Sequence, residues 1–197
     1  MANAAMGFRV KSGWAAAIVL SNSSDSPTVR LARRIDLCDP AFPETRQPYH
    51  ATDDARCELE EREDRLRPRL DVIRRVTNES IRGLLGECRA NGWTPRSAGI
   101  VGGSLTDPLT IRSPHVRAHA LDGRTFRTVV EDTLTAVGLS CVVLGERAAV
   151  DVATEALHRD ERALRKTLAY LGRGAEGPWR ADQKLAALAA WVALSNP

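Results

Sequence analysis

Two histidines lie at a spacing that could do metal chemistry. His115 and His119 are four residues apart in a segment predicted to be helical, so both imidazoles would lie on one face and could bind zinc. The glutamate that follows the first histidine in helical zinc-protease motifs is absent, because Val116 stands there. A helix-surface or capping role therefore fits the two histidines better than a zinc site.

The start of the same segment predicts an anion site. Ser113 and Pro114 are typical of a helix N-cap and the first helical position. The free backbone N–H groups of a helix N-terminus attract anions. Four side chains that suit an anion surround this start: Arg112, His115, Arg117 and Arg124. We expect phosphate or nucleic acid to bind there.

Other chemistries have less support. Gly102-Gly103-Ser104 could let backbone amides approach a phosphate, but a plain turn after a strand explains the glycines better, and no Walker lysine pattern occurs. Neither Ser104 nor Ser113 has a histidine base in a recognisable catalytic motif. The cysteines form no C-x-x-C pair, so we expect reduced structural thiols: Cys38, Cys57, Cys88 and Cys141.

The composition is that of an ordinary globular protein, with 197 residues, 43% hydrophobic and 27% charged. These values argue against a disordered chain, a collagen or a coiled coil. The net charge is +3, and all but three of the 28 basic residues are arginines. Arginine suits bidentate phosphate contact, but a biased genome composition explains the arginine content better because the charge is dispersed.

The sequence predicts a soluble, cytoplasmic protein. No apolar run approaches the roughly 18 residues that a membrane-spanning helix needs. The N-terminal region has no basic cluster leading into an apolar stretch and a cleavage site, so we predict no secretory signal. We therefore expect no membrane partner.

Three short strands are predicted first. Phe8–Lys11, Ala15–Leu20 and Thr28–Ile35 are apolar or alternating runs that turn residues separate, which predicts an antiparallel meander. Residues 39–69 are interpreted as a loop and helical insertion, because three prolines and no periodicity precede a charged helical segment. Apolar residues then follow one helical stripe, in which Pro68 starts or kinks the packed part: Leu66, Leu70, Ile73, Ile81, Leu84 and Cys88.

Helices and strands alternate after this helix, which Asn91-Gly92 is predicted to end. Buried strands are predicted at Ser97–Gly103 and Leu139–Leu144, with a helical stripe between them that Asp122-Gly123 could divide. Residues 148–194 are predicted to be helical with a break at 172–178. This order predicts one mixed α/β domain over residues 1–197 with a helical C-terminus, and it is the order of the ribonuclease H-like fold.

Three segments resemble the YqgF/RuvX family of resolvases and ribosomal-RNA nucleases, which are relatives of RuvC. Ile100–Leu105 is similar to the family's strand that ends in a glycine loop, and Ala181–Leu188 is similar to its last helix. Val142–Ala149 resembles the strand that closes with an Asp-Glu-Arg signature, although Gly145 replaces the aspartate. The resemblance covers residues 70–194, and the meander matches by order only.

This resemblance implies a metal-dependent nuclease site that has been altered. Family nucleases bring carboxylates from the first strand, a later strand end and a helix onto divalent metals. Glu146 and Asp182 match two of these positions, but Arg9 and Lys11 stand where the first-strand aspartate is expected. A cation there argues against the two-metal mechanism and could take the place of the metal. We therefore favour a noncatalytic, degenerate member, without a cofactor, that binds structured nucleic acid or a protein partner.

Two alternatives remain open. The chain could be a nuclease or resolvase that uses Mg²⁺ or Mn²⁺ on Glu146, Asp182 and a substitute acid such as Asp36 or Asp107. It could instead be a structural or assembly module whose long charged helix is a partner surface. Trp179 and Trp191 predict a C-terminal helix packed in the core or in a homodimer interface.

Overall fold

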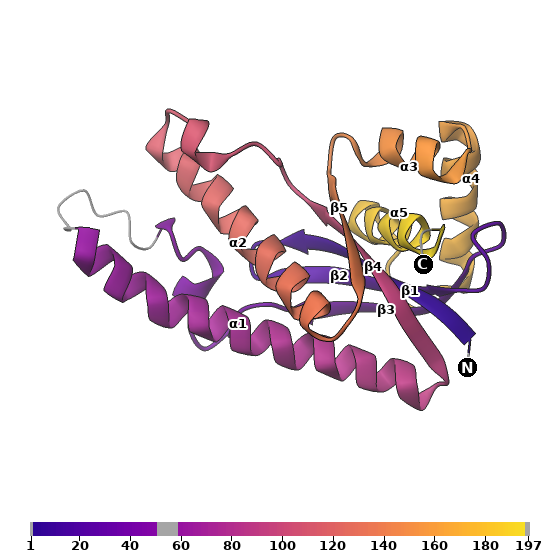
Figure 1. Cartoon of the computed structure of the whole chain (residues 1–197), viewed down its shortest axis with the longest axis horizontal. Helices are drawn as coiled ribbons and strands as arrows, with labels where there is room; N and C mark the ends of the chain where they lie inside the picture. The colour runs from indigo at the N-terminus through magenta and orange to yellow at the C-terminus, as the bar shows by residue number, and fades with distance from the viewer. Residues whose placement is uncertain (1, 51–58, 196–197) are drawn as a thin grey trace.

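Five strands form one mixed sheet. The computed structural model describes residues 2–50 and 59–195 (Figure 1). The strands are β1 (Ala2–Lys11), β2 (Trp14–Ser21), β3 (Thr28–Asp36), β4 (Trp93–Gly102) and β5 (Ser140–Gly145). Their order is β3-β2-β1-β4-β5; β1, β2 and β3 pair antiparallel, while β4 pairs parallel with both β1 and β5. The predicted meander and mixed sheet are confirmed.

Helices cover both faces of this sheet, and each face has its own apolar core (Figure 1). One face packs against α1 (Leu59–Ala90) and α2 (Pro114–Ala136). The other packs against α3 (Ala149–Leu157), α4 (Glu161–Leu171) and α5 (Ala181–Ser195). Short 3₁₀ turns complete the described elements: η1 (Pro43–Arg46), η3 (Pro108–Thr110) and η4 (Gly172–Gly174).

The alternation of β1 decides which face each of its side chains occupies. Met6, Phe8 and Val10 belong to the core under α1 and α2. Ala5 belongs to the core under α5. Because successive strand residues point to opposite faces, Arg9 and Lys11 share the α5 face with Ala5.

Helix α5 lies unusually close to the sheet because glycine and alanine line the contact. A Cβ on Gly7 would overlap the carbonyl oxygen of Ala186 and lie 2.5 Å from the backbone nitrogen of Ala190. A Cβ on Gly99 would overlap the carbonyl group of Ala189. The backbones of α5, β1 and β4 therefore fix one another's positions without intervening side chains.

Helix α2 begins and continues through features of its sequence. The Ser113 hydroxyl accepts a hydrogen bond from the Val116 N–H at 3.4 Å, as the predicted N-cap requires. The predicted division at Asp122-Gly123 is wrong, because α2 runs unbroken through both residues. A single helical glycine costs only about 1 kcal/mol relative to alanine, and the packing of Phe126 and Val130 outweighs that cost.

Other boundaries differ from the sequence predictions in detail. Helix α1 begins at the predicted charged end and contains Pro68, and Gly92 follows its last residue with φ +74° as predicted. Residues 51–54 of the predicted loop lie outside the described residues, as does Cys57. The C-terminal helical region has a further break, where His158 takes a left-handed conformation (φ 50°) and Asp160 caps α4.

The remaining sequence predictions concern cysteines, tryptophan and membranes. The other three cysteines, Cys38, Cys88 and Cys141, are free thiols. Trp191 is fully buried and its indole N–H donates to the Ser24 carbonyl oxygen at 2.6 Å, so it belongs to the core. Within the described residues, no helix has the length and apolar character needed to cross a membrane.

Candidate functional site

The two acids singled out from the sequence meet at one edge of the sheet. Arg9 lies near the carboxyl end of β1, Glu146 follows β5 directly, and Asp182 lies in the first turn of α5. The carboxyl ends of neighbouring parallel strands form a common edge, which is where ligands bind in many α/β sheets. Together with Lys11, the last residue of β1, these residues form the arginine cluster.

One buried guanidinium joins the two acids. Arg9 Nη2 lies 2.6 Å from Glu146 Oε2, and Arg9 Nε lies 3.7 Å from Asp182 Oδ1. Lys11 Nζ lies 3.3 Å from the same Asp182 oxygen. The Arg9 side chain is 3% exposed, whereas those of Glu146 and Asp182 are 46% and 30% exposed. The acids therefore face solvent while the cation lies beneath them.

Backbone contacts hold these side chains in place. The Glu146 N–H donates to the Gly102 carbonyl oxygen at 3.1 Å, which ties the turn after β5 to the end of β4. Arg9 Nη1 donates to the carbonyl oxygens of Val10 and Val101 at 3.1 and 3.4 Å. The close contact of α5 with Gly7 and Gly99 places Asp182 over β1. The cluster thus takes two side chains from β1, one from the turn after β5 and one from α5.

The charges of the arginine cluster do not suit a divalent cation. Two cations and two anions balance, and the pairing compensates the buried guanidinium for part of its lost hydration, since Arg9 Nε forms no hydrogen bond within the described residues. A metal held by both carboxylates would lie beside Arg9 and Lys11, and unit like charges 4 Å apart repel by about 4 kcal/mol at an effective dielectric constant of 20. The residues present therefore do not fit Mg²⁺ or Mn²⁺.

The acids considered as substitutes have other surroundings. Asp107 accepts a hydrogen bond from the Leu109 N–H at 3.2 Å and pairs with Arg124 at 3.4 Å. Asp36 ends β3, which β2 separates from β1. Among the described residues, Glu146 and Asp182 are the acids that form ion pairs with Arg9 or Lys11.

A surface pocket of about 510 Å³ opens beside Glu146. Residues 103–106 of the loop after β4 and residues 145–148 after β5 line it. The loop that begins at Gly103 therefore lies next to Glu146 and Arg147. Arg147 is exposed at this edge.

The four residues of the predicted anion site have separate surroundings. Arg117 donates through Nε and Nη2 to the Ile111 carbonyl oxygen at 2.9 and 2.7 Å, so it fastens the segment before α2. Arg124 pairs with Asp107 at 3.4 Å. Arg112 is exposed, and His115 lies beside His119. Arg112 and His115 are the exposed members of the predicted anion site.

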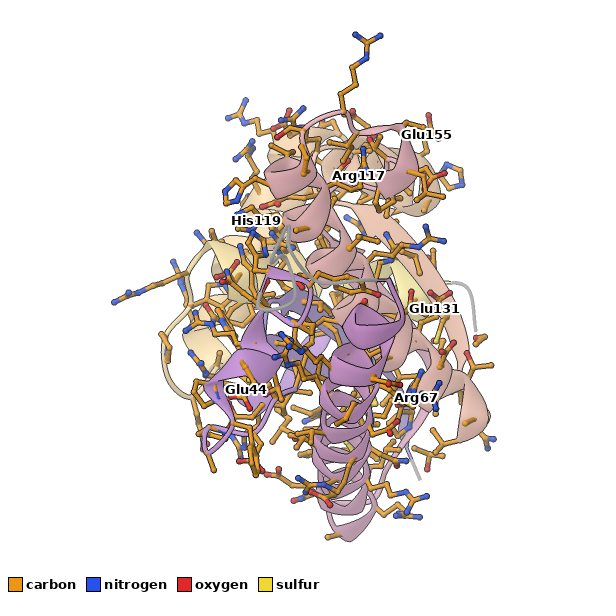
Figure 2. All side chains as sticks on the ribbon, turned by 90° about the vertical axis from the view of Figure 1, so that its left-hand side faces the viewer. Glu44, Arg67, Arg117, His119, Glu131 and Glu155 are labelled. Carbon is orange, nitrogen blue, oxygen red and sulfur yellow. The ribbon has the colours of Figure 1, made fainter. Side chains whose placement is uncertain are left out.

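A third histidine joins the pair found in the sequence. His50, His115 and His119 each offer a ligand atom, and these atoms lie within 4.8 Å of one another. His50 Nδ1 lies 2.8 Å from Oδ2 of the buried Asp122. These four residues form the histidine cluster, at the end of α2 where Figure 2 labels His119 and Arg117. Sequence reasoning missed His50 because it lies in an aperiodic loop far from α2 along the chain.

Comparison with known proteins supports the fold. Neither a family model nor a curated protein sequence matches this chain. RuvC of T. thermophilus, in complex with a Holliday junction substrate, is 12% identical, with a TM-score of 0.50 over 96% of this chain and 90% of that chain. A second Thermus thermophilus RuvC structure is 11% identical, with a TM-score of 0.48 over 96% and 92% of the two chains.

A member of the Ppx/GppA family from Aquifex aeolicus is also similar. It is 12% identical, with a TM-score of 0.39 over 78% of this chain and 40% of that chain. At such identities the likeness to RuvC, together with the strand order, establishes the architecture. This chain has a ribonuclease H-like fold of the kind found in RuvC.

Proposed function

We propose that this chain is a degenerate YqgF-like relative of RuvC, a noncatalytic protein that binds structured nucleic acid. The single observation that carries the proposal is the Arg9 guanidinium, buried between the carboxylates of Glu146 and Asp182. These are the acids that the family resemblance assigns to a divalent metal. In this chain Arg9 and Lys11 together neutralise them.

Neutralisation of the acids removes the chemistry of a two-metal nuclease and keeps a surface that suits phosphates. Lys11 belongs to the arginine cluster, Arg147 follows Glu146 in the sequence, and Arg180 lies two residues before Asp182. Arg147 and Arg180 are exposed, and in the described part of the chain neither forms an ion pair. Arginine contacts phosphate oxygens bidentately, so this edge can hold a nucleic-acid backbone without cutting it.

Branched nucleic acid is the structured form that we favour. The RuvC structure with the same fold holds a Holliday junction, and its likeness extends over 96% of this chain. Because phosphate contacts position a protein without reading sequence, we expect discrimination by shape between a four-way junction and a linear duplex.

The test combines binding and cleavage. Fluorescence anisotropy should show tighter binding to a four-way junction than to a linear duplex, and gels with Mg²⁺ or Mn²⁺ should show no cleavage of either substrate. Arg147→Ala should weaken junction binding and reduce the salt slope by about one unit for a lost phosphate contact. Arg82→Ala, at an exposed position on α1, is the matched control.

Two outcomes would contradict the proposal. Equal affinity for junction and duplex, or no binding at all, would remove structured nucleic acid and favour a protein partner. Manganese-dependent cleavage that disappears in Glu146→Gln or Asp182→Asn, with the fold intact, would establish the nuclease alternative instead. The meeting of Glu146 and Asp182 at one sheet edge, beside a pocket, is the observation that favours this second candidate.

The anion site predicted at the start of α2 can be tested in the same assay. Arg112 is exposed, so Arg112→Ala removes a charge without releasing an internal contact. Arg117→Ala would also free the Ile111 carbonyl oxygen. A loss of affinity in Arg112→Ala would support phosphate binding there, and unchanged affinity and salt slope would remove it from the interface.

A further inference from the structure

We propose that the histidine cluster is a site for a zinc-like transition-metal ion, held by His50, His115 and His119 with Asp122 behind His50. The ligand atoms come from two segments that are distant in sequence, the loop before α1 and the first turns of α2. This inference is independent of the arginine cluster, and it shares His115 with the anion site predicted at the start of α2.

The spacing of the two helical imidazoles matches tetrahedral zinc. His115 Nε2 and His119 Nε2 lie 3.2 Å apart. Zinc–nitrogen bonds of about 2.0–2.1 Å in tetrahedral geometry place two ligand nitrogens about 3.3–3.4 Å apart. The His50 ring centroid lies 5.1 Å from that of His115 and 3.8 Å from that of His119. One ion could therefore reach all three rings with small side-chain adjustments.

His50 is prepared as a ligand by its surroundings. Its Nδ1 lies 2.8 Å from Oδ2 of Asp122, whose other oxygen accepts a hydrogen bond from the Tyr49 N–H at 2.9 Å. A carboxylate on one ring nitrogen is the usual arrangement behind a metal-bound histidine, because it places the proton there and leaves the other nitrogen with a lone pair. That other nitrogen, His50 Nε2, is buried and has no hydrogen-bond partner among the described residues.

The side chains of the histidine cluster are of types that suit a transition-metal ion. Among the described residues, no lysine or arginine forms an ion pair with Asp122. Desolvation, followed by the nearby His50 and His115, lowers the pKa of His119. Burial raises the pKa of Asp122, and the hydrogen bonds from Tyr49 and His50 oppose that rise. Three imidazoles suit zinc and its transition-metal neighbours, whereas magnesium and calcium prefer oxygen ligands.

Three protein ligands leave one tetrahedral position for water or an outside ligand. His115 and His119 are exposed, so this position would open to solvent. A bound ion would also join the loop that carries His50 to α2. We therefore expect the ion to stabilise the folded chain, since it binds a geometry that the unfolded chain lacks.

Isothermal titration with zinc in a phosphine reductant should give one equivalent bound with micromolar or tighter affinity. Cobalt(II) should give the visible absorption of a tetrahedral site. His115→Ala and His119→Ala, both at exposed positions, should each weaken zinc binding at least tenfold. The matched control is His158→Asn, which changes the fourth histidine and suits its left-handed backbone.

Thermal unfolding gives a second readout. Zinc at about one hundred times its dissociation constant should raise the Tm of the unmodified chain by about 5 °C or more, and magnesium should not. Absence of zinc binding at 100 μM would overturn the proposal. Zinc binding that is equally strong in His115→Ala and His119→Ala would also overturn it, because the ion would then be held by other groups such as the thiols.

Discussion

The arginine cluster and the histidine cluster differ in whether lysine and arginine side chains accompany their carboxylates. In the arginine cluster two carboxylates pair with the same guanidinium of Arg9, and Lys11 pairs with one of them. In the histidine cluster three imidazoles and one buried carboxylate converge without a lysine or arginine among them. The two clusters therefore differ in their side-chain types, and we expect those types, rather than the position on the fold, to decide which cluster binds a metal.

Gly7→Ala should give the largest loss of stability, because it removes the backbone contact that positions the arginine cluster. The new Cβ would overlap the Ala186 carbonyl oxygen, so α5 would have to leave β1 and carry Asp182 away from Arg9. We expect a loss of about 3 kcal/mol or more in the free energy of unfolding, measured by urea denaturation.

Gly83→Ala is the control for this change. Nothing lies within 4 Å of a Cβ at Gly83, which is in α1, so alanine there should stabilise the chain by about 0.5–1 kcal/mol. Equal stability of Gly7→Ala and the unmodified chain would show that α5 is not held by backbone contact.

Arg9→Asp would replace the buried cation of the arginine cluster by a third carboxylate. Three acids would then lie together without the guanidinium, and the variant should lose about 3 kcal/mol in metal-free buffer. Millimolar Mg²⁺ should restore part of that stability, because the new carboxylate completes an oxygen-rich site. Urea denaturation with and without Mg²⁺ measures both effects.

Two comparisons make this result decisive. The Tm of the unmodified chain should not respond to Mg²⁺. Arg9→Met removes the charge without adding an acid, so it should be destabilised without any recovery in Mg²⁺. A rise in the Tm of the unmodified chain with Mg²⁺ would show that the arginine cluster binds metal despite its arginine.

Asp122→Asn tests whether the buried carboxylate orients His50 in the histidine cluster. With the oxygen of the new side-chain amide taken by the Tyr49 N–H, the amide NH₂ would face His50 Nδ1 and move the imidazole proton to Nε2, the nitrogen that the metal needs. We expect zinc affinity to fall about 10- to 100-fold, as for other partners behind metal ligands. Titration calorimetry measures the change, and unchanged affinity would exclude a role for Asp122 in orienting His50.

Lys11→Gln should have the smallest effect. Its ion pair with Asp182 is partly exposed, with 37% of the lysine side chain accessible, so its loss should cost less than about 1 kcal/mol. The variant Arg74→Gln, which breaks an exposed pair with Asp71 on α1, is the matched comparison in urea denaturation. A loss of stability near that of Arg9→Asp would show that the Lys11–Asp182 ion pair contributes as much as the buried pairs of Arg9.

The sequence predicted most of the fold because its periodic segments agree with the packing. The meander, the buried strands and the long helical stripes all appear, since alternation and helical spacing place apolar residues on the faces that the helices cover. The continuous α2 was less predictable. A glycine after an acid weakens a helix locally, and only the tertiary contacts of the buried Asp122 and Phe126 show why the helix persists.

Candidate residues in short sequence motifs were predictable, whereas contacts between distant segments were not. Glu146 and Asp182 follow from short motifs, and the cation at Arg9 follows from its place in the first strand. That Arg9 lies within ion-pairing distance of both acids required the structure, because three separate elements determine it. His50 carried no signal, since a loop has no period that relates it to the face of α2.

The glycine and alanine contact under α5 restricts how the molecule could change state. With Gly7 and Gly99 against the helix backbone, α5 cannot slide or rotate without lifting from β1 and β4. The amides beneath it should therefore be among the last to exchange with deuterium, opening only with the whole domain. A conformational change at this sheet edge would therefore have to move the half-exposed Glu146 and its turn, while Asp182 stays in place with α5.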